Sequence, residues 1–168
     1  MAVGNTAIRV EGLDKVMKQL DDKVRKVRFQ TKKGLIRAGL FIQGEAQKRV
    51  PVDLANLKAS AFTVWGDKSI EMKPFKEDKG GKMSKDHVSV VGTEASKLST
   101  YNAIPMTPFM VEVGFSAFYA LYVHEDMQAK HPNGGEAKYL QKAVSENRET
   151  ILKLVKEEIS KVPKKGKK

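Results

Sequence analysis

The amino-acid sequence predicts an α+β protein in which a small antiparallel sheet packs with two N-terminal helices and one long C-terminal helix. Three observations lead to this prediction. Apolar residues recur at three- and four-residue steps in the first 50 residues and again after residue 140, which is the period of an amphipathic helix. Segments rich in β-branched and aromatic residues lie between these two regions. Strands and helices separated along the chain in this way are typical of an α+β domain, which we expect to span residues 1–160.

The first 50 residues are expected to contain a short strand and two helices. Alternation of apolar and polar residues predicts a strand at Ala7–Glu11, closed by Gly12. A helical period begins at Leu13, and a second helix is expected from Thr31, as its N-cap, to Arg49. The apolar face of the first helix comprises Leu13, Val16, Met17, Leu20, Val24 and Val27, and that of the second comprises Leu35, Ala38, Ile42 and Ala46.

Three glycines, Gly34, Gly39 and Gly44, recur at five-residue spacing within the second helix. Each glycine destabilises a helix by about 1 kcal/mol relative to alanine. We therefore expect close packing of the backbone against a neighbouring element to compensate. Pro51 ends the helix, because proline forces the preceding residue towards an extended conformation.

The middle of the chain is predicted to form the sheet. Residues 60–65, 87–92 and 110–115 are rich in β-branched and aromatic residues or alternate between apolar and polar ones. Between the first two segments we expect a long charged loop inserted at residues 66–86, and a second loop at residues 96–108 contains two prolines. Long loops of this kind are usually functional or disordered.

The last part of the chain is predicted to be one long helix. Its apolar face comprises Leu140, Val144, Ile151, Leu154, Val155 and Ile159. Pro163 ends this helix. Residues 161–168 hold five lysines and no acidic residue, so we expect them to form a flexible basic tail.

The composition argues against several classes of protein. The chain has no cysteine, which excludes a disulfide scaffold, a thiolate metal site and a cysteine nucleophile. Its apolar runs are far shorter than the roughly 18 residues that a membrane span needs. The N-terminus lacks the basic and apolar stretches of a signal peptide. We therefore expect a soluble protein of a reducing compartment, with no membrane partner.

The charge balance is strongly basic. Lys and Arg number 31 against 20 Asp and Glu, which gives a net charge of +11. Such a balance favours an anionic partner such as a nucleic acid, although lysine-rich surfaces also keep proteins soluble. Arginine, the residue that most often reads bases, occurs only six times. Two interpretations stay open at this point, a solvated surface and contact with an anionic partner.

No catalytic motif is present. The sequence lacks a phosphate-binding loop, a dinucleotide fingerprint and a nucleophile elbow, so we predict that the chain is not an enzyme and needs no cofactor. The densest polar cluster is His124-Glu125-Asp126, with His131 seven residues after His124. Two imidazoles and a carboxylate can bind zinc or non-haem iron, which makes a metal-dependent hydrolase one hypothesis. The spacing does not match a His-x-x-x-His pair on a helix, and we favour structural hydrogen bonds instead.

Two stretches resemble motifs of one family of tailed-bacteriophage proteins. Ala46–Asp53, followed by Asn56–Ser60, resembles a motif at a helix end in the tail components of these phages, a family also described as neck (head–tail joining and tail-completion) proteins. Phe118–Met127, followed by His131–Gly134 and Ala137–Leu140, looks like the family's Tyr-Ala-x-Tyr-Val-His-Glu stretch and the helix start after it. The residues that carry the resemblance are Pro51, Asp53, Leu57, Ser60, Tyr119, Ala120, Tyr122, His124, Glu125, Gly134, Lys138 and Leu140.

This resemblance implies a structural virion protein without catalysis, a neck or tail-completion subunit that joins the head connector to the tail. It implies a homo-oligomeric ring, a hexamer or a dodecamer, located in the virion after assembly in the host cytoplasm. The implied partners are the connector or head-closure protein and the tail tube or terminator protein. Because such rings surround the DNA path, lysines could contact phosphates without reading sequence. The candidates for DNA or subunit contacts are Lys76, Lys79, Lys82, Lys85, Lys161, Lys164, Lys165, Lys167 and Lys168.

Two alternatives stay open. One is a tail terminator that caps the tail tube. The other is a nonspecific, basic nucleic-acid-binding module, which the net charge motivates. This second alternative predicts binding to duplex DNA with a steep dependence on salt.

Overall fold

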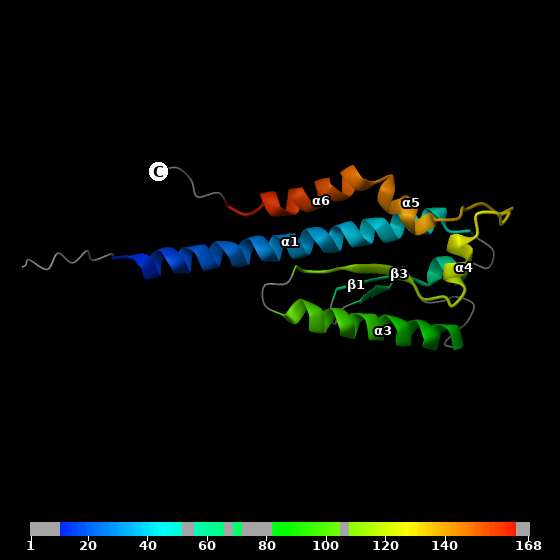
Figure 1. Cartoon of the computed structure of the whole chain (residues 1–168), viewed down its shortest axis with the longest axis horizontal. Helices are drawn as coiled ribbons and strands as arrows, with labels where there is room; N and C mark the ends of the chain where they lie inside the picture. The colour runs from blue at the N-terminus through cyan, green and yellow to red at the C-terminus, as the bar shows by residue number, and fades with distance from the viewer. Residues whose placement is uncertain (1–10, 52–55, 66–68, 72–81, 105–107, 164–168) are drawn as a thin grey trace, which may run out of the picture.

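The computed structural model describes residues 11–51, 56–65, 69–71, 82–104 and 108–163. The elements in chain order are α1 (Leu13–Arg49), α2 (Asn56–Ala59), β1 (Ala61–Val64), β2 (Ser69–Glu71), α3 (Lys82–Ala103), β3 (Glu112–Phe115), α4 (Ala120–Glu125), α5 (Tyr139–Ser145) and α6 (Arg148–Ser160). Figure 1 shows them in layers, with α5 and α6 on one side of α1, the sheet on its other side and α3 beneath the sheet. The predicted α+β class is confirmed.

The sheet has three antiparallel strands in the order β2-β1-β3. In its register, Thr63 on β1 lies opposite Ile70 on β2 and Val113 on β3. All four residues of β1 are buried, because α1 packs against this strand and α3 packs against it as well. The strands predicted near residues 60–65 and 110–115 are confirmed as β1 and β3.

The two predicted N-terminal helices are one continuous helix of 37 residues, Leu13–Arg49. Thr31, the predicted N-cap, lies inside this helix, and its hydroxyl donates to the carbonyl of Val27 at 2.9 Å. A threonine can make this bond to the preceding turn without breaking a helix. The helix ends as predicted before Pro51, where Val50 is extended with φ −60° and ψ 132°.

The close packing expected at the helical glycines occurs at two of the three positions. A Cβ atom on Gly34 would lie 2.9 Å from the Cα atom of Val155 on α6. A Cβ atom on Gly39 would lie 2.8 Å from Cγ1 of Val111, which precedes β3. Nothing lies within 4 Å of such an atom on Gly44. Without a side chain, Gly34 thus lets α6 approach α1 closely, and Gly39 lets the sheet approach it.

The predicted strand at residues 87–92 is wrong, because this segment lies inside helix α3. His87 and Val91, four residues apart, are buried, whereas Val88 and Val90 are exposed. In a strand, buried and exposed residues would instead alternate along the chain. The β-branched composition therefore predicted a strand where burial follows the four-residue spacing of a helix.

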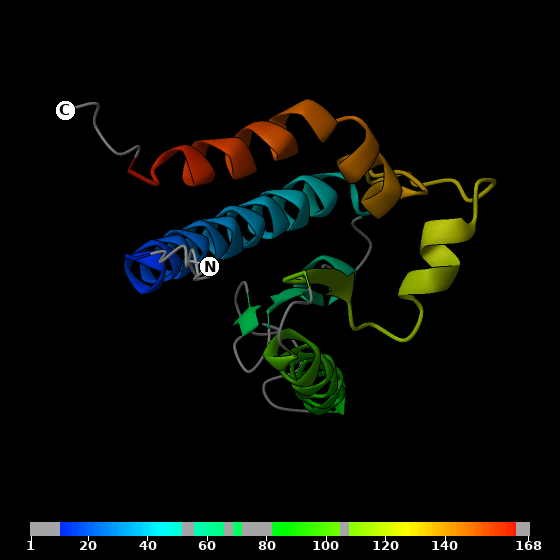
Figure 2. The same cartoon turned by 60° about the vertical axis from the view of Figure 1, so that its left-hand side comes forward.

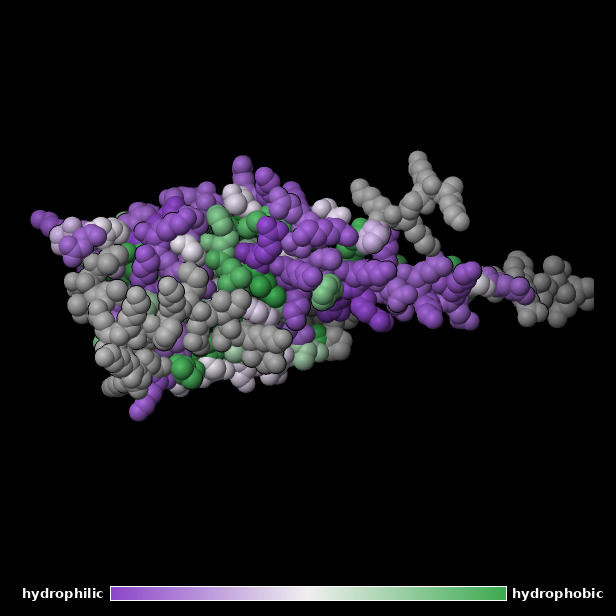
Figure 3. Space-filling model, turned by 180° about the vertical axis from the view of Figure 1, so that it is seen from behind, coloured by the Kyte–Doolittle hydropathy of each residue, from purple (hydrophilic) through white to green (hydrophobic). Residues whose placement is uncertain are grey.

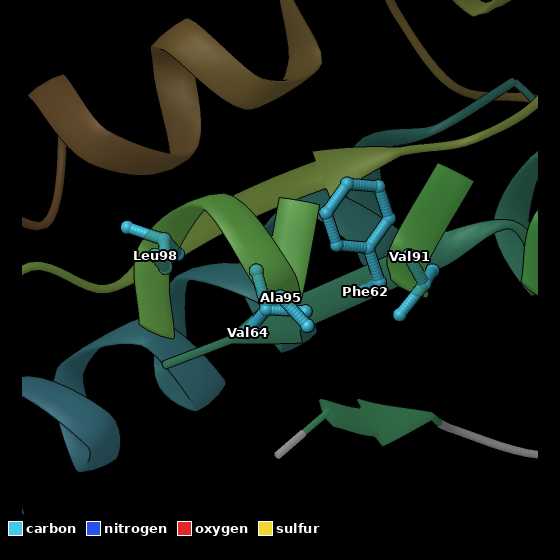
Figure 4. Close-up of a cluster of buried hydrophobic side chains, with 5 residues drawn as sticks. All are labelled: Phe62, Val64, Val91, Ala95 and Leu98. Atoms are coloured by element: carbon cyan, nitrogen blue, oxygen red, sulfur yellow. The ribbon is translucent and has the colours of Figure 1, made fainter. Parts of the chain in front are cut away.

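The core between α3 and the sheet explains why the helix forms. Phe62 and Val64 of β1 pack against Val91, Ala95 and Leu98, which are spaced like one face of a helix (Figure 4). The three helical residues are 7% exposed or less. One face of α3 therefore covers the sheet.

Both predicted loops are shorter than expected. Within residues 66–86, a strand occupies residues 69–71 and α3 begins at Lys82. Within residues 96–108, α3 continues to Ala103. The remaining part of the first loop, residues 66–68 and 72–81, lies outside the described residues.

The single C-terminal helix that we predicted is divided into α5 and α6. Asn147 lies between them with φ −110° and ψ 16°, and its side-chain amide donates to the carbonyl of Ala143 at 3.0 Å. Asparagine side chains compete with the helix for backbone groups, which favours a break at this position.

Most of the predicted first strand, residues 7–10, lies outside the described part of the chain, and so do residues 164–168 of the predicted tail. The separation of a domain at residues 1–160 from that tail stays a prediction. Among the helices that the structure describes, none has the length and apolar character needed to cross a membrane.

A buried carboxylate connects α6 to α1. Glu158 is 5% exposed and accepts hydrogen bonds from Lys161 at 2.6 Å and Arg37 at 2.7 Å. These two cations hold the pKa of Glu158 below its usual value of 4.5. The carboxylate therefore stabilises the fold fully above that value, and this stabilisation is lost as the pH falls through the lower pKa of the folded state.

We expect Glu158→Gln to lower the melting temperature at pH 7 and to have little effect at pH 3. The neutral amide loses both charged partners at pH 7, whereas at low pH the native carboxyl is protonated as well. Thermal unfolding of both proteins at the two pH values measures this. Glu149→Gln, at an exposed position of the same helix, is the control. An equal loss at both pH values would contradict the charge-based account.

Candidate functional site

The stretches that carry the family resemblance meet at one corner of the molecule. There the end of α1, the helix α4 and the start of α5 come together (Figure 2). Val50, Leu57, Ala120 and Tyr139 form a buried apolar cluster at this place, and partly buried residues, Phe115, Ala117, Tyr119, Val123 and Leu140, pack against it. Segments that lie far apart in the sequence thus share one small core, which we call the α4 corner.

The centre of the α4 corner is Tyr139. Its side chain is 1% exposed, and its hydroxyl donates to the carbonyl of Ala120 at 2.9 Å. Its ring meets the rings of Phe115 and His124 edge-on, with centroids 5.0 and 4.8 Å away. Burial, with a smaller contribution from Tyr119, raises the pKa of Tyr139 to about 12. The phenol therefore stays protonated at neutral pH and can always donate to α4.

Lys138 fixes the end of α4 to the start of α5. Its backbone is left-handed, with φ 57° and ψ 26°, a conformation that costs a residue other than glycine about 1 kcal/mol. Two contacts compensate for this cost. The amide of Lys138 donates to the carbonyl of His124 at 2.7 Å, and its ammonium forms an ion pair with Glu125.

Two of the polar residues of the predicted cluster, His124 and Glu125, contact each other, whereas Asp126 accepts from the backbone amides of Gln128 and Ala129. Nδ1 of His124 lies 2.7 Å from Oε1 of Glu125. The hydrogen bond from Lys138, followed by that of His124, holds the pKa of the Glu125 carboxyl below its usual range. Glu125 is thus an ionised acceptor that links two neighbours, which agrees with the structural hydrogen bonds that we favoured for this cluster.

A second connection closes the corner against the end of α1. The amide of Glu136 donates to the carbonyl of Arg49 at 2.9 Å. Gly134 and Gly135 have φ values of +87° and +98°, in the region that favours glycine. A Cβ atom on Gly135 would lie only 2.3 Å from the Cα atom of Pro51. The backbones of the two motifs therefore touch, and a side chain could not fit between them.

The guanidinium of Arg49 connects three acidic residues around this contact. It lies 2.7 Å from Glu146, 3.1 Å from Glu45 and 3.5 Å from Glu136. The hydrogen bond to Glu146, followed by that to Glu45, raises the pKa of Arg49. The end of α1 is thereby fixed to the segments on either side of α5.

Four of the twelve residues that carry the resemblance are buried, and Tyr119, His124, Lys138 and Leu140 are partly buried. Pro51 is buried, Leu57 and Ala120 belong to the apolar cluster, and Ser60 is fully buried with its hydroxyl donating to the carbonyl of Leu57 at 2.7 Å. Asp53 lies outside the described residues. The four buried residues, Pro51, Leu57, Ser60 and Ala120, shape the corner, whereas Tyr122, Glu125 and Gly134 are exposed.

The outer surface of the α4 corner is apolar. Phe118, Leu121, Tyr122 and Met127 are 84%, 68%, 75% and 66% exposed. We call these four residues the outer patch. Helix α4 has its buried residue, Ala120, on the side of the cluster and turns Leu121 and Tyr122 away from it.

Three residues that matter at this corner, Tyr139, Gly135 and Arg49, lie in or beside the stretches that carry the resemblance, but the sequence assigned none of them a role of its own. The adjacent glycines 134 and 135 are a turn signal, since such pairs often mark positive φ values. Nothing local in the sequence indicates that Tyr139 is central or that Lys138 is left-handed. Both depend on contacts between distant segments.

The predicted contact lysines that the structure describes belong to two separate parts of the chain. Lys85 is exposed on α3, and Lys82 is the first residue of that helix. Lys161 is paired with Glu158. The candidates Lys76, Lys79, Lys164, Lys165, Lys167 and Lys168 lie outside the described residues.

No group of three His, Asp or Glu side chains in the described part of the chain is arranged to hold a metal ion. This includes the set of His124, Glu125 and His131 on which the hydrolase hypothesis depended. Two hollows in the described surface lie along α6 and α3, and each is lined by residues of a single helix. Catalytic sites usually bring together residues from several elements in a concave pocket.

The chain matches no protein-family model, and comparisons with curated proteins and with solved structures also found no match.

Proposed function

We propose that the chain is a structural virion protein of a tailed bacteriophage, a neck or tail-completion ring subunit that joins the head connector to the tail. The observation that supports this most is the α4 corner. There the polar residues of the motif hold the backbone in place, while large apolar side chains point outwards.

The carboxylate and the phenol at the α4 corner are used within the fold. Glu125 is bound by Lys138 and His124, and the hydroxyl of Tyr139 is bound to the backbone of α4. A motif that served proton transfer would instead direct such groups towards a substrate. The arrangement is better suited to building a rigid surface than to catalysis.

The outer patch is the kind of surface that protein partners bind. Contiguous apolar side chains on a rigid element mark interaction sites on otherwise soluble proteins. In a ring, each subunit presents one surface to the subunit before it and a different surface to the one after it. We propose that the outer patch is one of these two surfaces, in a hexamer or a dodecamer.

The remaining features of the proposal follow from this role. The protein would act in the virion after assembly in the host cytoplasm, without catalysis, with the connector or head-closure protein on one side and the tail tube or terminator protein on the other. Lysines facing the channel would contact DNA phosphates without reading sequence.

We expect the double substitution Leu121→Gln with Tyr122→Gln to abolish assembly while leaving the fold intact. Both side chains are exposed, so their replacement changes stability by about 0.5 kcal/mol or less. Complementation of a phage that lacks the gene measures assembly, and thermal unfolding measures the fold. Val88→Gln, an exposed apolar position on α3, is the matched control. Full complementation by the double variant would contradict the role of the outer patch.

A second candidate, the nucleic-acid-binding module, is favoured by the charge of α1. Residues 23–33 contain six basic residues and no acidic one. Such a segment could follow a phosphate backbone, with affinity that falls steeply as salt increases. A tail terminator would use the same α4 corner and is distinguished by the length of the tails that form without it.

A further inference from the structure

The N-terminal part of α1 projects from the body of the molecule. Figure 1 shows that it extends beyond α6, α3 and the sheet, and Figure 3 shows it as a narrow projection with a largely hydrophilic face towards the viewer. We call residues 13–30 of α1 the arm, which is roughly 27 Å long at the rise of an α-helix. Leu13, Val16, Met17, Leu20 and Val24 of the arm are 60%, 61%, 51%, 53% and 49% exposed.

These five residues form one stripe, because their three- and four-residue spacing places them on a single face of the helix. A stripe of this kind is usually buried against a partner. Nothing in the described residues covers it, whereas the opposite face of the arm carries charged side chains such as Lys15, Asp22 and Lys26.

The stripe continues into a helix pair that already exists in the structure. Leu13, Leu20, Val27 and Gly34 follow one another at seven-residue steps, and so do Met17, Val24, Thr31 and Ala38. These are the a and d positions of a coiled-coil heptad. At Gly34 the seam is filled by α6, whose Val155 lies against that glycine, and Ala38 is buried.

Helix α6 runs antiparallel to α1 and covers only the C-terminal half of this seam. Its last turn contains Glu158, which contacts Gly34 and pairs with Arg37, and the helix ends at Ser160. Beyond that point the residues of the seam become large and apolar. The arm therefore offers an open position for another helix, continuous with the one that α6 occupies.

The charges of the arm indicate which helix fits. Residues 11–22 contain four acidic and two basic residues, whereas residues 23–33 contain six basic residues and no acidic one. The lysines of residues 161–168 would be repelled by the second segment, so the end of this chain is a poor occupant. An antiparallel second copy of the arm is complementary, because it places the acidic end of each arm beside the basic segment of the other.

We propose that two copies of this chain associate through their arms as an antiparallel coiled coil. Pairing with Leu20 opposite the partner's Val24 also sets Met17 opposite the partner's Val27, so that both layers are apolar. It brings Asp14 near the partner's Arg28. A parallel pair would instead place Arg28 of each arm beside Lys23 of the other, where it has no acidic partner.

The length of the arm agrees with this register. With residue 20 opposite residue 24 of the partner, the first residue of each helix, Leu13, lies opposite residue 31 of the other chain. Residue 31 lies close to the point along α1 where α6 ends. The arm of the second copy therefore packs along the seam from the position at which α6 stops covering it. This two-fold association goes beyond the proposed neck function and does not depend on it.

Disulfide cross-linking tests the pairing, and the absence of native cysteines makes it unambiguous. We expect a mixture of the full-length variants Met17→Cys and Val27→Cys to form the mixed dimer on oxidation, whereas Met17→Cys alone should not cross-link. In the antiparallel pair, the two copies of residue 17 are about 15 Å apart, beyond the roughly 7 Å between Cα atoms that a disulfide bridges. Ready cross-linking of Met17→Cys with itself would overturn the antiparallel arrangement.

The mass of the protein in solution provides the second readout. Sedimentation equilibrium of the native chain should give twice the 18.7 kDa of one chain at micromolar concentrations and above. Leu20→Gln should return it to the monomer mass without changing the melting temperature, because the arm is outside the body. Lys18→Gln, on the opposite face of the arm, should remain dimeric. A native chain that is monomeric at every concentration, or a Leu20→Gln variant that stays dimeric, would overturn the proposal.

Discussion

Replacing Gly135 with alanine is expected to lower the free energy of unfolding by about 3 kcal/mol. Gly135 has a φ of +98°, and a Cβ atom built on it would lie 2.3 Å from the Cα atom and 2.4 Å from the nitrogen of Pro51. Both close atoms belong to the backbone, so no side chain can rotate away to make room. The loop after α4 and the end of α1 would have to separate, and urea unfolding measures the loss.

Two other glycine substitutions identify the cause of the expected loss of stability. Gly134 also has a positive φ, of +87°, but nothing lies within 4 Å of a Cβ atom built on it. This makes Gly134→Ala a control for the contact. It should therefore show only the conformational part of the loss, about 1 kcal/mol. Gly44→Ala, with no close neighbour in the middle of α1, should raise stability by about 1 kcal/mol. Equal effects of Gly135→Ala and Gly134→Ala would show that the contact with Pro51 is unimportant.

Tyr139→Ala is expected to lower the free energy of unfolding by about 4 kcal/mol. The substitution empties the centre of the α4 corner, where the ring meets Phe115 and His124, and it removes the hydrogen bond from the hydroxyl to the carbonyl of Ala120. Chemical denaturation measures the loss. Near-ultraviolet circular dichroism of the remaining aromatic residues reports whether the corner stays ordered.

Tyr139→Phe separates the two contributions. It keeps the ring and removes only the hydroxyl, so the loss should be about 1.5 kcal/mol, the upper end of the net contribution of one hydrogen bond. If the phenylalanine variant were as unstable as the alanine variant, the hydrogen bond to α4 would dominate. If Tyr139→Ala cost less than 1.5 kcal/mol, the corner would not be the rigid element on which the proposed function depends.

The general class of the fold was predictable from the sequence, because it depends on local patterns. The strict alternation near residues 110–115 and the apolar residues of α1 and α6 gave the right type of element. The error at residues 87–92 arose because the β-propensity of branched residues depends on packing against neighbouring strands, whereas this segment packs one helical face against the sheet. The buried positions His87, Val91, Ala95 and Leu98 have helical spacing, and that period was the better guide.

The breaks between helices were less predictable. The continuity of α1 through Thr31 depends on its own helical hydrogen bonds, because a threonine is compatible with both a cap and a helix interior. The division at Asn147 depends on how α5 and α6 each pack against α1. Sequence period alone reports neither the local hydrogen bonds at Thr31 and Asn147 nor the packing of α5 and α6 against α1.

The candidate site was also predictable only in part. The resemblance led to the residues of the α4 corner, which the structure brings together from the end of α1, from α4 and from α5. It did not separate the buried Ser60 and Ala120 from the exposed Tyr122, because exposure is decided by the packing of the corner. It also gave no indication that the apolar face of the arm has no partner within the described chain.

Deletion of the gene from the phage that carries it, followed by negative-stain electron microscopy of the lysate, tests the proposed neck function most directly. The proposal predicts DNA-filled heads beside unattached tails, and a plasmid copy of the gene should restore complete particles. Tails of abnormal length would assign the chain to the tail terminator instead. Normal, infectious particles would contradict a structural role at the neck and would favour the nucleic-acid-binding module.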